Sequence, residues 1–376
     1  MLLLNTKSAC ARSWNILVSV KTLSQLDFFY LIFWENRDYT FYVLVGETFC
    51  LQDIYNSKFA QLPNLILNCD SSQLISKIEK IGMVLTTESS AACLDMQALL
   101  LFSLCSELDI PVVEMQHSIV QYGVHYHAEV KSYAETKSYG TFKYYINVEP
   151  FAEHLLSFYP VTTERCQGTV IGFPKYHLSG LQCSGCDAGY ILIFSNFNFE
   201  CYTPEDLCTF SGCILKAAAA HPEFQFVWKT CTETEDCFIK NVNLDAYENI
   251  TLVQSDQLLS LLSLESLIKN ASKVISTLST VLLDCEAYRK NTILFKCESV
   301  AQLFSEINNC CTFSNSEQLI VFVENEESCL VNSGKLREFD NSKFRNFVEQ
   351  TFSNCRKART EILKQIARYS ALIGCH

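Results

Sequence analysis

The sequence lacks any excess of positive charge: 29 Lys and Arg residues stand against 41 Asp and Glu residues, for a formal net charge of −12. Without a basic field a protein cannot hold a phosphate backbone, which argues against a general nucleic-acid-binding function. No apolar run reaches the roughly 18 to 20 residues that span a bilayer. The first twenty residues also lack the basic and then apolar segments of a secretory signal. We therefore expect a cytoplasmic protein.

The 20 cysteines lack the spacing of a metal site. They are spread over the whole chain, mostly inside apolar runs, and the only Cys-x-x-Cys pair is Cys183 and Cys186. A zinc site would need a second pair at ligand spacing, which Cys201, Cys208 and Cys213 do not supply. We expect a loop around the first pair, and elsewhere mostly buried thiols that act as small hydrophobic side chains in a reducing compartment.

Three of the seven histidines gather in the stretch "MQHSIVQYGVHYH", residues 115–127. His125 and His127 are two positions apart, so on a strand they would share one face. A zinc site takes three or four converging ligands, and the sequence names no third or fourth. We interpret these two histidines as packing or loop-surface residues, with a metal site as the alternative.

The residues that are present predict an α/β protein with two Rossmann-like domains facing a cleft. With 376 residues, 49% of them apolar and 19% charged, the chain is long and apolar enough for two cores. Near-continuous apolar runs alternate with helical patterns, an arrangement that is typical of parallel sheets covered on both faces. The sequence shows no internal repeats. The predicted strands are residues 14–20, 39–45, 64–69, 82–87, 111–116, 190–195, 224–229, 249–253, 273–277 and 292–297.

The domain boundary is predicted within residues 172–189, which hold four of the twelve glycines and a proline. We expect an N-terminal Rossmann-like domain at 1–179, a second Rossmann-like domain at 180–340, and a C-terminal helix at 341–376. That helix carries seven Lys or Arg residues against two Glu residues. It either presents a solvated face or packs back on the first domain; the functional alternative is docking on anionic lipid headgroups or a phosphorylated acceptor.

Ligands of open α/β sheets bind outside the carboxyl ends of the strands, which selects the residues that follow each predicted strand. Glu88 follows residues 82–87 and could take a proton from an acceptor hydroxyl; alternatively it opens the next helix, where the dipole favours a carboxylate. His117 follows residues 111–116 and could form hydrogen bonds or transfer a proton near neutral pH.

The strand at 273–277 runs through Leu278 into Ser279 and Thr280 and at once into a helix. Helix N-termini carry free N–H groups and a positive dipole end, and hydroxyls in the first turn add donors, so this turn could hold a phosphate. The alternative is that Ser279 or Thr280 simply caps the helix.

The segment around this turn resembles a known protein family. "SLLSLESLIKNASKVISTLSTVLLDCEAYRKNTILF" (260–295) is similar to the donor-binding region of bacterial GT-B glycosyltransferases of capsule and surface-polysaccharide synthesis, such as Kdo and sialic acid transferases and CDP-glycerol glycerophosphotransferases. "VEMQHS" (113–118), "TVIGFPKYHL" (169–178) and "HPEFQFVWKT" (221–230) resemble further family segments in the same order. The resemblance implies donor or phosphate contacts from Ser279, Thr280, Lys229, Thr230, Ser255 and Glu286, with Asp284 as the alternative acid, and cleft positions at Gln116 and Ser118.

The sequence departs from this family pattern at three places. The family's Gln-His-Gly ends in Ser118 here, its Gly-Asn-Pro asparagine is Phe173, and the His-Pro after its lysine strand is Cys231-Thr232. Because the histidine of that pair contacts the donor phosphate in the family, its absence weakens donor binding or indicates another donor.

The predicted function is a metal-independent transfer of a sugar, or of glycerol phosphate, from a CMP-, CDP- or UDP-linked donor to a surface polysaccharide or lipid-linked precursor. No Asp-x-Asp metal motif of such transferases is visible. Glu88 or His117 would act as the base. The alternatives are a nucleotide-sugar 2-epimerase on the same scaffold and a catalytically inactive member that binds a glycan or a partner. Peripheral membrane contact through the basic C-terminal helix also remains open.

Overall fold

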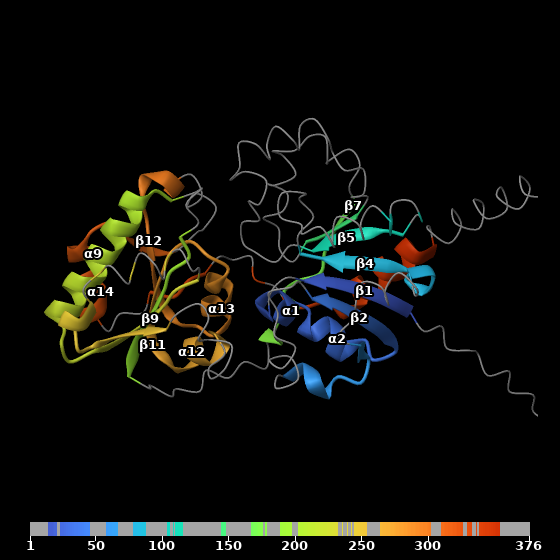
Figure 1. Cartoon of the computed structure of the whole chain (residues 1–376), viewed down its shortest axis with the longest axis horizontal. Coiled ribbons are helices and arrows are strands. Elements are labelled where there is room, and N and C mark those ends of the chain that lie inside the picture. The colour runs from blue at the N-terminus through green and yellow to red at the C-terminus, as the bar shows by residue number, and fades with distance from the viewer. Residues whose placement is uncertain are drawn as a thin grey trace, which may run out of the picture.

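The chain forms two domains, each built on one parallel sheet (Figure 1). The computed structural model describes residues 14–20, 23–45, 58–66, 78–87, 104–105, 108, 110–115, 144–147, 167–175, 177–178, 189–197, 202–231, 235, 239, 242, 244–253, 264–301, 310–325, 329–332, 336 and 338–353.

The first sheet has the strand order β3-β2-β1-β4-β5-β6-β7, and all its pairs are parallel. The order reverses between β1 and β4, which is the topological switch point of a Rossmann fold. Its strands are β1 (Trp14–Val20), β2 (Tyr39–Val45), β3 (Leu65–Ile66), β4 (Met83–Thr86), β5 (Val112–Met115), β6 (Tyr144–Asn147) and β7 (Gln167–Val170).

The second sheet repeats this arrangement with the order β10-β9-β8-β11-β12-β13, again entirely parallel. Its switch point lies between β8 and β11. The prediction of two Rossmann-like domains is therefore confirmed. The strands are β8 (Tyr190–Phe194), β9 (Gln225–Lys229), β10 (Ile250–Val253), β11 (Ala271–Ser276), β12 (Asn291–Phe295) and β13 (Cys311–Phe313).

The strands are buried because helices cover the sheets. All four residues of β4 are buried, as are four of the five residues of β8, which explains their unbroken apolar sequences. In the second domain, α9 (Pro204–Ala220) and α14 (Ser316–Glu324) pack against each other on its outer side (Figure 1). Thr203 and Asp206 begin α9 with a reciprocal capping box. Further helical elements are α1 (Leu23–Phe28), α2 (Tyr30–Glu35), η1 (Lys58–Gln61), η2 (Ile78–Lys80), η4 (Leu244–Ala246), α12 (Leu264–Asn270) and α13 (Val281–Ala287).

The chain crosses between the domains twice, and the two crossings lie side by side. Phe173, on the way out, forms a parallel bridge with Glu338, on the way back. The backbone N–H of Asp340 donates to the carbonyl of Ile171 at 2.7 Å. Glu338 and Asp340, on the returning segment, are thus bonded to the segment that leaves the first domain.

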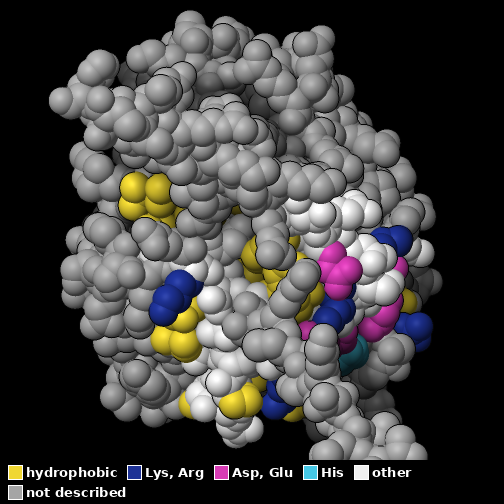
Figure 2. Space-filling view, turned by 90° about the vertical axis from the view of Figure 1, so that its right-hand side faces the viewer, with side chains coloured by type: hydrophobic (Ala, Val, Ile, Leu, Met, Phe, Trp, Pro, Cys, Tyr) yellow, Lys and Arg dark blue, Asp and Glu magenta, His cyan; other side chains and the backbone are white. Residues whose placement is uncertain are grey.

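Residues 341–353 form a helix that contacts the first domain. Arg345 donates to both carboxylate oxygens of Asp38, at 2.9 and 2.7 Å, and Phe352 packs edge-on against Trp14 with 4.3 Å between ring centroids. Among the described side chains on the face seen in Figure 2, acidic and basic groups lie next to each other on the right-hand side of the view. Among the residues that the structure describes, no helix is both long and apolar enough to cross a membrane.

One pair of cysteines departs from the expectation of mostly buried thiols. Cys311 at the start of β13 and Cys329 form a disulfide, with 5.8 Å between their Cα atoms. Of the free cysteines that the structure describes, Cys105, Cys213 and Cys285 are buried as expected, whereas Cys297 and Cys310 are half-buried and Cys208 and Cys231 are exposed. Cys183 and Cys186 lie outside the described residues.

Candidate functional site

The carboxyl edge of the second sheet is held together by hydrogen bonds between the loops that leave its central strands. Ser195, directly after β8, donates its N–H to the carbonyl of Lys229 at 3.0 Å. The hydroxyl of Thr277, directly after β11, accepts from the N–H of Asn196 at 2.9 Å, and the N–H of Thr277 donates to the carbonyl of Phe194 at 3.2 Å. The ends of β8, β9 and β11 therefore form one fixed edge at the switch point.

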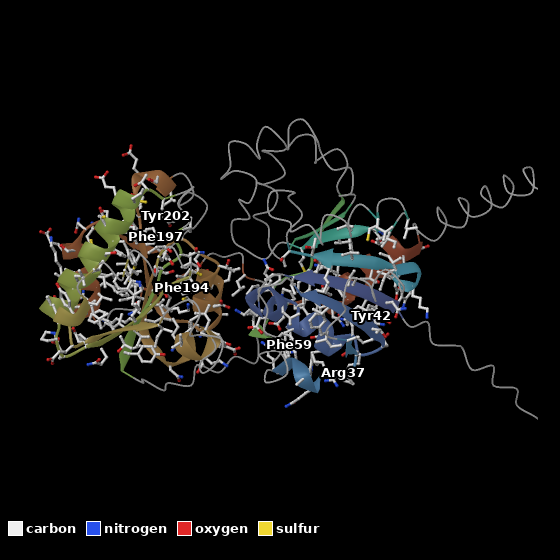
Figure 3. The ribbon with its side chains drawn as sticks, in the orientation of Figure 1. Arg37, Tyr42, Phe59, Phe194, Phe197 and Tyr202 are labelled. Carbon is white, nitrogen blue, oxygen red and sulfur yellow. A yellow bond between two sulfur atoms is a disulfide. The ribbon has the colours of Figure 1, made fainter. Side chains whose placement is uncertain are left out.

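Aromatic side chains pack against one another next to this edge. Phe197 packs edge-on against Tyr202 and Phe210, with ring centroids 4.9 and 5.3 Å apart. Figure 3 shows Phe194, Phe197 and Tyr202 gathered in the second domain near the end of β8. The hydroxyl of Tyr202 also accepts from the N–H of Leu278 at 3.0 Å, so the loop after β11 is fastened to the start of α9.

The turn from Leu278 to Thr280 reaches the surface, because all three residues are half-buried, whereas Ser276 and Thr277 before them are buried. The Ser279 hydroxyl accepts from the N–H of Val281 at 3.2 Å. Thr280 occupies the N-cap position of α13, and its side chain makes no capping hydrogen bond. Ser279 thus caps the helix, while the half-buried Thr280 side chain makes no capping bond at the carboxyl edge of the sheet. The turn can present hydroxyl donors to an anion there.

Lys229 and Thr230 end β9 below the surface. Lys229 is 4% exposed and Thr230 is fully buried. The Lys229 ammonium donates to the Thr230 carbonyl, and the N–H of Thr230 donates to the carbonyl of Val253 at 3.2 Å. Both residues therefore lie within the domain at this edge, and their predicted contact with the donor stays a prediction.

Glu235 is a residue of this edge that the sequence did not reveal. It is fully buried, and its carboxylate accepts from the N–H of Phe197 at 2.5 Å and from the N–H of Cys231 at 2.7 Å. Hydrogen bonds to a carboxylate are stronger than those between neutral groups. Glu235 therefore links the loop after β8 to the loop after β9. Its carboxylate accepts two of the backbone N–H groups at this edge. In the sequence, the indication of such a residue is the acidic run "TETED" (232–236), which follows a predicted strand.

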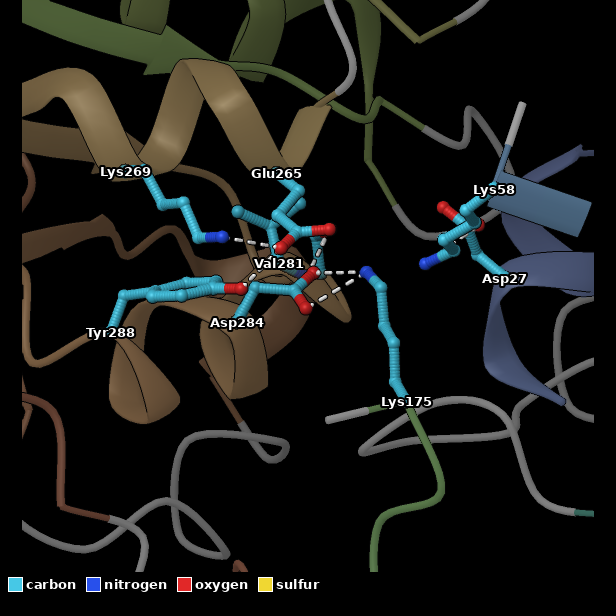
Figure 4. Close-up of polar contacts among 9 residues, drawn as sticks. Asp27, Lys58, Lys175, Glu265, Lys269, Val281, Asp284 and Tyr288 are labelled. Atoms are coloured by element: carbon cyan, nitrogen blue, oxygen red, sulfur yellow. Dashed lines mark hydrogen bonds and ion pairs between the residues drawn. The ribbon is translucent and has the colours of Figure 1, made fainter. Parts of the chain in front are cut away.

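A second cluster lies where α13 meets the segment that leaves the first domain (Figure 4). The Lys175 ammonium lies 2.9 and 3.1 Å from the two carboxylate oxygens of Asp284 on α13. Only 8% of Lys175 and 2% of Asp284 are exposed. Burial by itself lowers the pKa of Lys175, but the carboxylates of Asp284, Asp27 and Glu265 together outweigh it, and the pKa of Lys175 is raised. Glu286, two positions further on, is half-buried.

Further charges flank this pair from both domains. On the second domain, Glu265 of α12 accepts from Lys269 and from the Tyr288 hydroxyl, each at 2.7 Å. Burial acts to raise the pKa of Glu265, but these donors and nearby Lys58 outweigh it, and its pKa is lowered. On the first domain, Lys58 pairs with Asp27 at 3.2 Å, and Figure 4 shows this pair across from Glu265.

The structure thus brings four of the predicted donor-site residues, Lys229, Thr230, Ser279 and Thr280, to the carboxyl edge of the second sheet. Within the described part of the chain, no three His, Cys, Asp or Glu side chains are placed to hold a metal ion. Seven further residues that the sequence singled out lie outside the described residues: Glu88, Gln116, His117, Ser118, His125, His127 and Ser255.

No protein-family model and no curated protein matches the sequence. Solved structures do match its fold. The UDP-GlcNAc 2-epimerase of Methanocaldococcus jannaschii, in complex with UDP-GlcNAc and UDP, has a TM-score of 0.57 at 12% identity, over 93% of this chain and 99% of its own. Anabaena HepE, in complex with UDP and glucose, has a TM-score of 0.54 at 9% identity, over 95% and 99%. A variant of the wall teichoic acid polymerase TagF has a TM-score of 0.53 at 8% identity, over 94% and 90%.

These likenesses span nearly the whole of each chain. They show that the two Rossmann-like domains are combined as in the GT-B fold. At such low identity they establish the fold alone, so the chemistry has to be argued from the residues.

Proposed function

We propose that the chain is a transferase that moves a sugar, or a glycerol phosphate, from a nucleotide-activated donor to a surface polysaccharide or a lipid-linked glycan precursor. The observation that carries the proposal is the half-buried turn Leu278–Thr280 at the switch point of the second sheet. Ligands of doubly wound sheets bind at that point. The UDP complexes of two similar folds support a nucleotide-linked donor.

In this proposal the second domain holds the donor. The hydroxyls of Ser279 and Thr280 donate hydrogen bonds to its phosphate oxygens, at the positive end of α13. Lys229 and Thr230, which are buried at the neighbouring end of β9, fix the position of that strand end. Glu286 contacts the ribose or the sugar, as the family resemblance implies, and Ser255 is a further donor or phosphate contact.

The first domain supplies the acceptor side. Glu88 or His117 takes the proton of the acceptor hydroxyl, whose oxygen forms the new bond as the bond to the nucleotide phosphate breaks. Gln116 and Ser118 line the same side. A nucleotide is already a good leaving group, so positioning and hydrogen bonds to its phosphates supply most of the rate enhancement, and the proposed reaction needs no metal.

Calorimetry with CMP, CDP and UDP tests the donor site. We expect one of the three to bind, and the double variant S279A/T280A to lose about tenfold or more of that affinity, which corresponds to about 1.4 kcal/mol. Thr312→Ala, an exposed threonine on β13, is the matched control and should leave binding unchanged. Absence of binding to all three nucleotides would contradict the proposal.

Two alternatives make different predictions. A nucleotide-sugar 2-epimerase would convert the donor without any acceptor, so product analysis with donor alone identifies it. A non-catalytic member that binds a glycan or a partner is favoured by one observation: Cys231 replaces the family's phosphate-contacting histidine, and its N–H is bound to Glu235. For that alternative, S279A/T280A would change neither nucleotide binding nor the glycans of the cell. The cytoplasmic location and peripheral membrane contact through residues 341–376 remain predictions.

A further inference from the structure

The side chain of Lys175 bridges the two domains. Its own backbone belongs to the first domain, because the preceding carbonyl, that of Pro174, accepts from the N–H of Leu31 in α2 at 2.9 Å. Its ammonium, in contrast, lies against Asp284 of the second domain. The two residues are 109 positions apart in the sequence.

Asp284 is close to the proposed donor turn along the chain. It lies four positions, about one helical turn, after Thr280, the N-cap of α13. A force on the Asp284 side chain is therefore transmitted to the turn through one rigid helical segment. The nearby paired crossings, Phe173 with Glu338 and Ile171 with Asp340, restrain the same region, so the ion pair adds a contact beyond the linkers themselves.

We propose that Lys175 is a positioning residue: its buried ion pair with Asp284 fixes the first turn of α13, and with it the donor turn, relative to the acceptor domain. The role of the turn rests on the proposed function. A buried charge without its partner is strongly disfavoured, so the pair holds the two domains in one arrangement. In a transfer reaction this arrangement decides whether acceptor and donor atoms meet, and small misplacements cost large factors in rate.

The two pairs that flank it do not bridge the domains in this structure. Lys58 and Asp27 are both in the first domain, and Lys269 and Glu265 are both in the second. Replacing a lysine of the second domain therefore offers a matched control: Lys269→Met removes an ion pair of similar length without removing a link between the domains.

The test measures domain arrangement and kinetics in the full chain. Fluorescent labels are attached through unnatural amino acids at the exposed positions Arg37 and Glu205, one in each domain. Energy transfer between them is compared for the unsubstituted chain, Lys175→Met, Asp284→Asn, the exchange variant K175D/D284K and the control Lys269→Met. Circular dichroism confirms that each variant is folded, and K175M/D284M, which removes both charges, replaces any single variant that fails to fold.

We expect the energy-transfer distribution to shift or broaden in the single variants or K175M/D284M, to return toward the original in K175D/D284K and to stay unchanged in Lys269→Met. With the donor, we expect kcat to fall about tenfold or more while KM changes little, since the donor turn itself is intact. An unchanged distribution in folded variants lacking the pair overturns the proposal, as does equal disturbance by the control. If the chain turns over no nucleotide sugar, the proposed function fails, while the energy-transfer measurement still decides the role of Lys175 in domain arrangement.

Discussion

Glu235 offers a stability test of the architecture at the carboxyl edge. Its carboxylate accepts from two backbone N–H groups, those of Phe197 and Cys231, at 2.5 and 2.7 Å, and is fully buried. Hydrogen bonds to charged groups contribute about 1.5–3 kcal/mol each. Glu235→Gln keeps one accepting oxygen but turns an NH2 group toward the second amide hydrogen. We therefore expect it to lower the free energy of unfolding by about 2–3 kcal/mol, and Glu235→Ala by about 3–5 kcal/mol.

Urea denaturation followed by tryptophan fluorescence measures these changes, because Trp228 is fully buried in the same domain and donates to Ser195 at this edge. Glu248→Gln, at an exposed position, is the matched control and should change stability by less than about 0.5 kcal/mol. If both Glu235 variants stayed within that same range, the carboxylate would not be binding the two loops, and the reasoning would be refuted.

Two further predictions concern the first domain's helix contact and the buried thiols. A Cβ added at Gly82 would lie 1.6 Å from an atom of the Phe352 ring, so Gly82→Ala should lower thermal stability by an amount equivalent to about 1–3 kcal/mol. The loss should be smaller in G82A/F352A than the sum of the two single changes, and strict additivity would contradict the contact. Burial raises the pKa of Cys285 to about 12, so this thiol stays protonated at pH 8. Alkylation at pH 8 followed by mass spectrometry should modify exposed Cys208 and spare Cys285 until the protein is unfolded.

The sheets were predictable because their central strands are buried on both faces and so have apolar sequences without interruption. The strands that sequence reasoning missed are β6, β7 and β13. They are three or four residues long and carry polar residues, as in the "QGTV" of β7. Segments of this kind are placed by pairing with a neighbouring strand and not by their own propensity.

The candidate site was predictable only where one short segment carries the signal. The passage from β11 through Ser279 into a helix is local, so its pattern predicts the turn. The contacts of Glu235 and the pair of Lys175 with Asp284 join segments that are distant in the sequence. No spacing rule connects residues 109 positions apart, and the disulfide between Cys311 and Cys329 was missed because apolar surroundings do not distinguish a thiol from a bonded sulfur.

The most direct test of the donor assignment is a crystal structure of the chain with whichever of CMP, CDP and UDP binds it most tightly. The assignment predicts a phosphate within hydrogen-bonding distance of the Ser279 or Thr280 hydroxyl, at the turn between β11 and α13. A nucleotide bound with its phosphates away from that turn would contradict it.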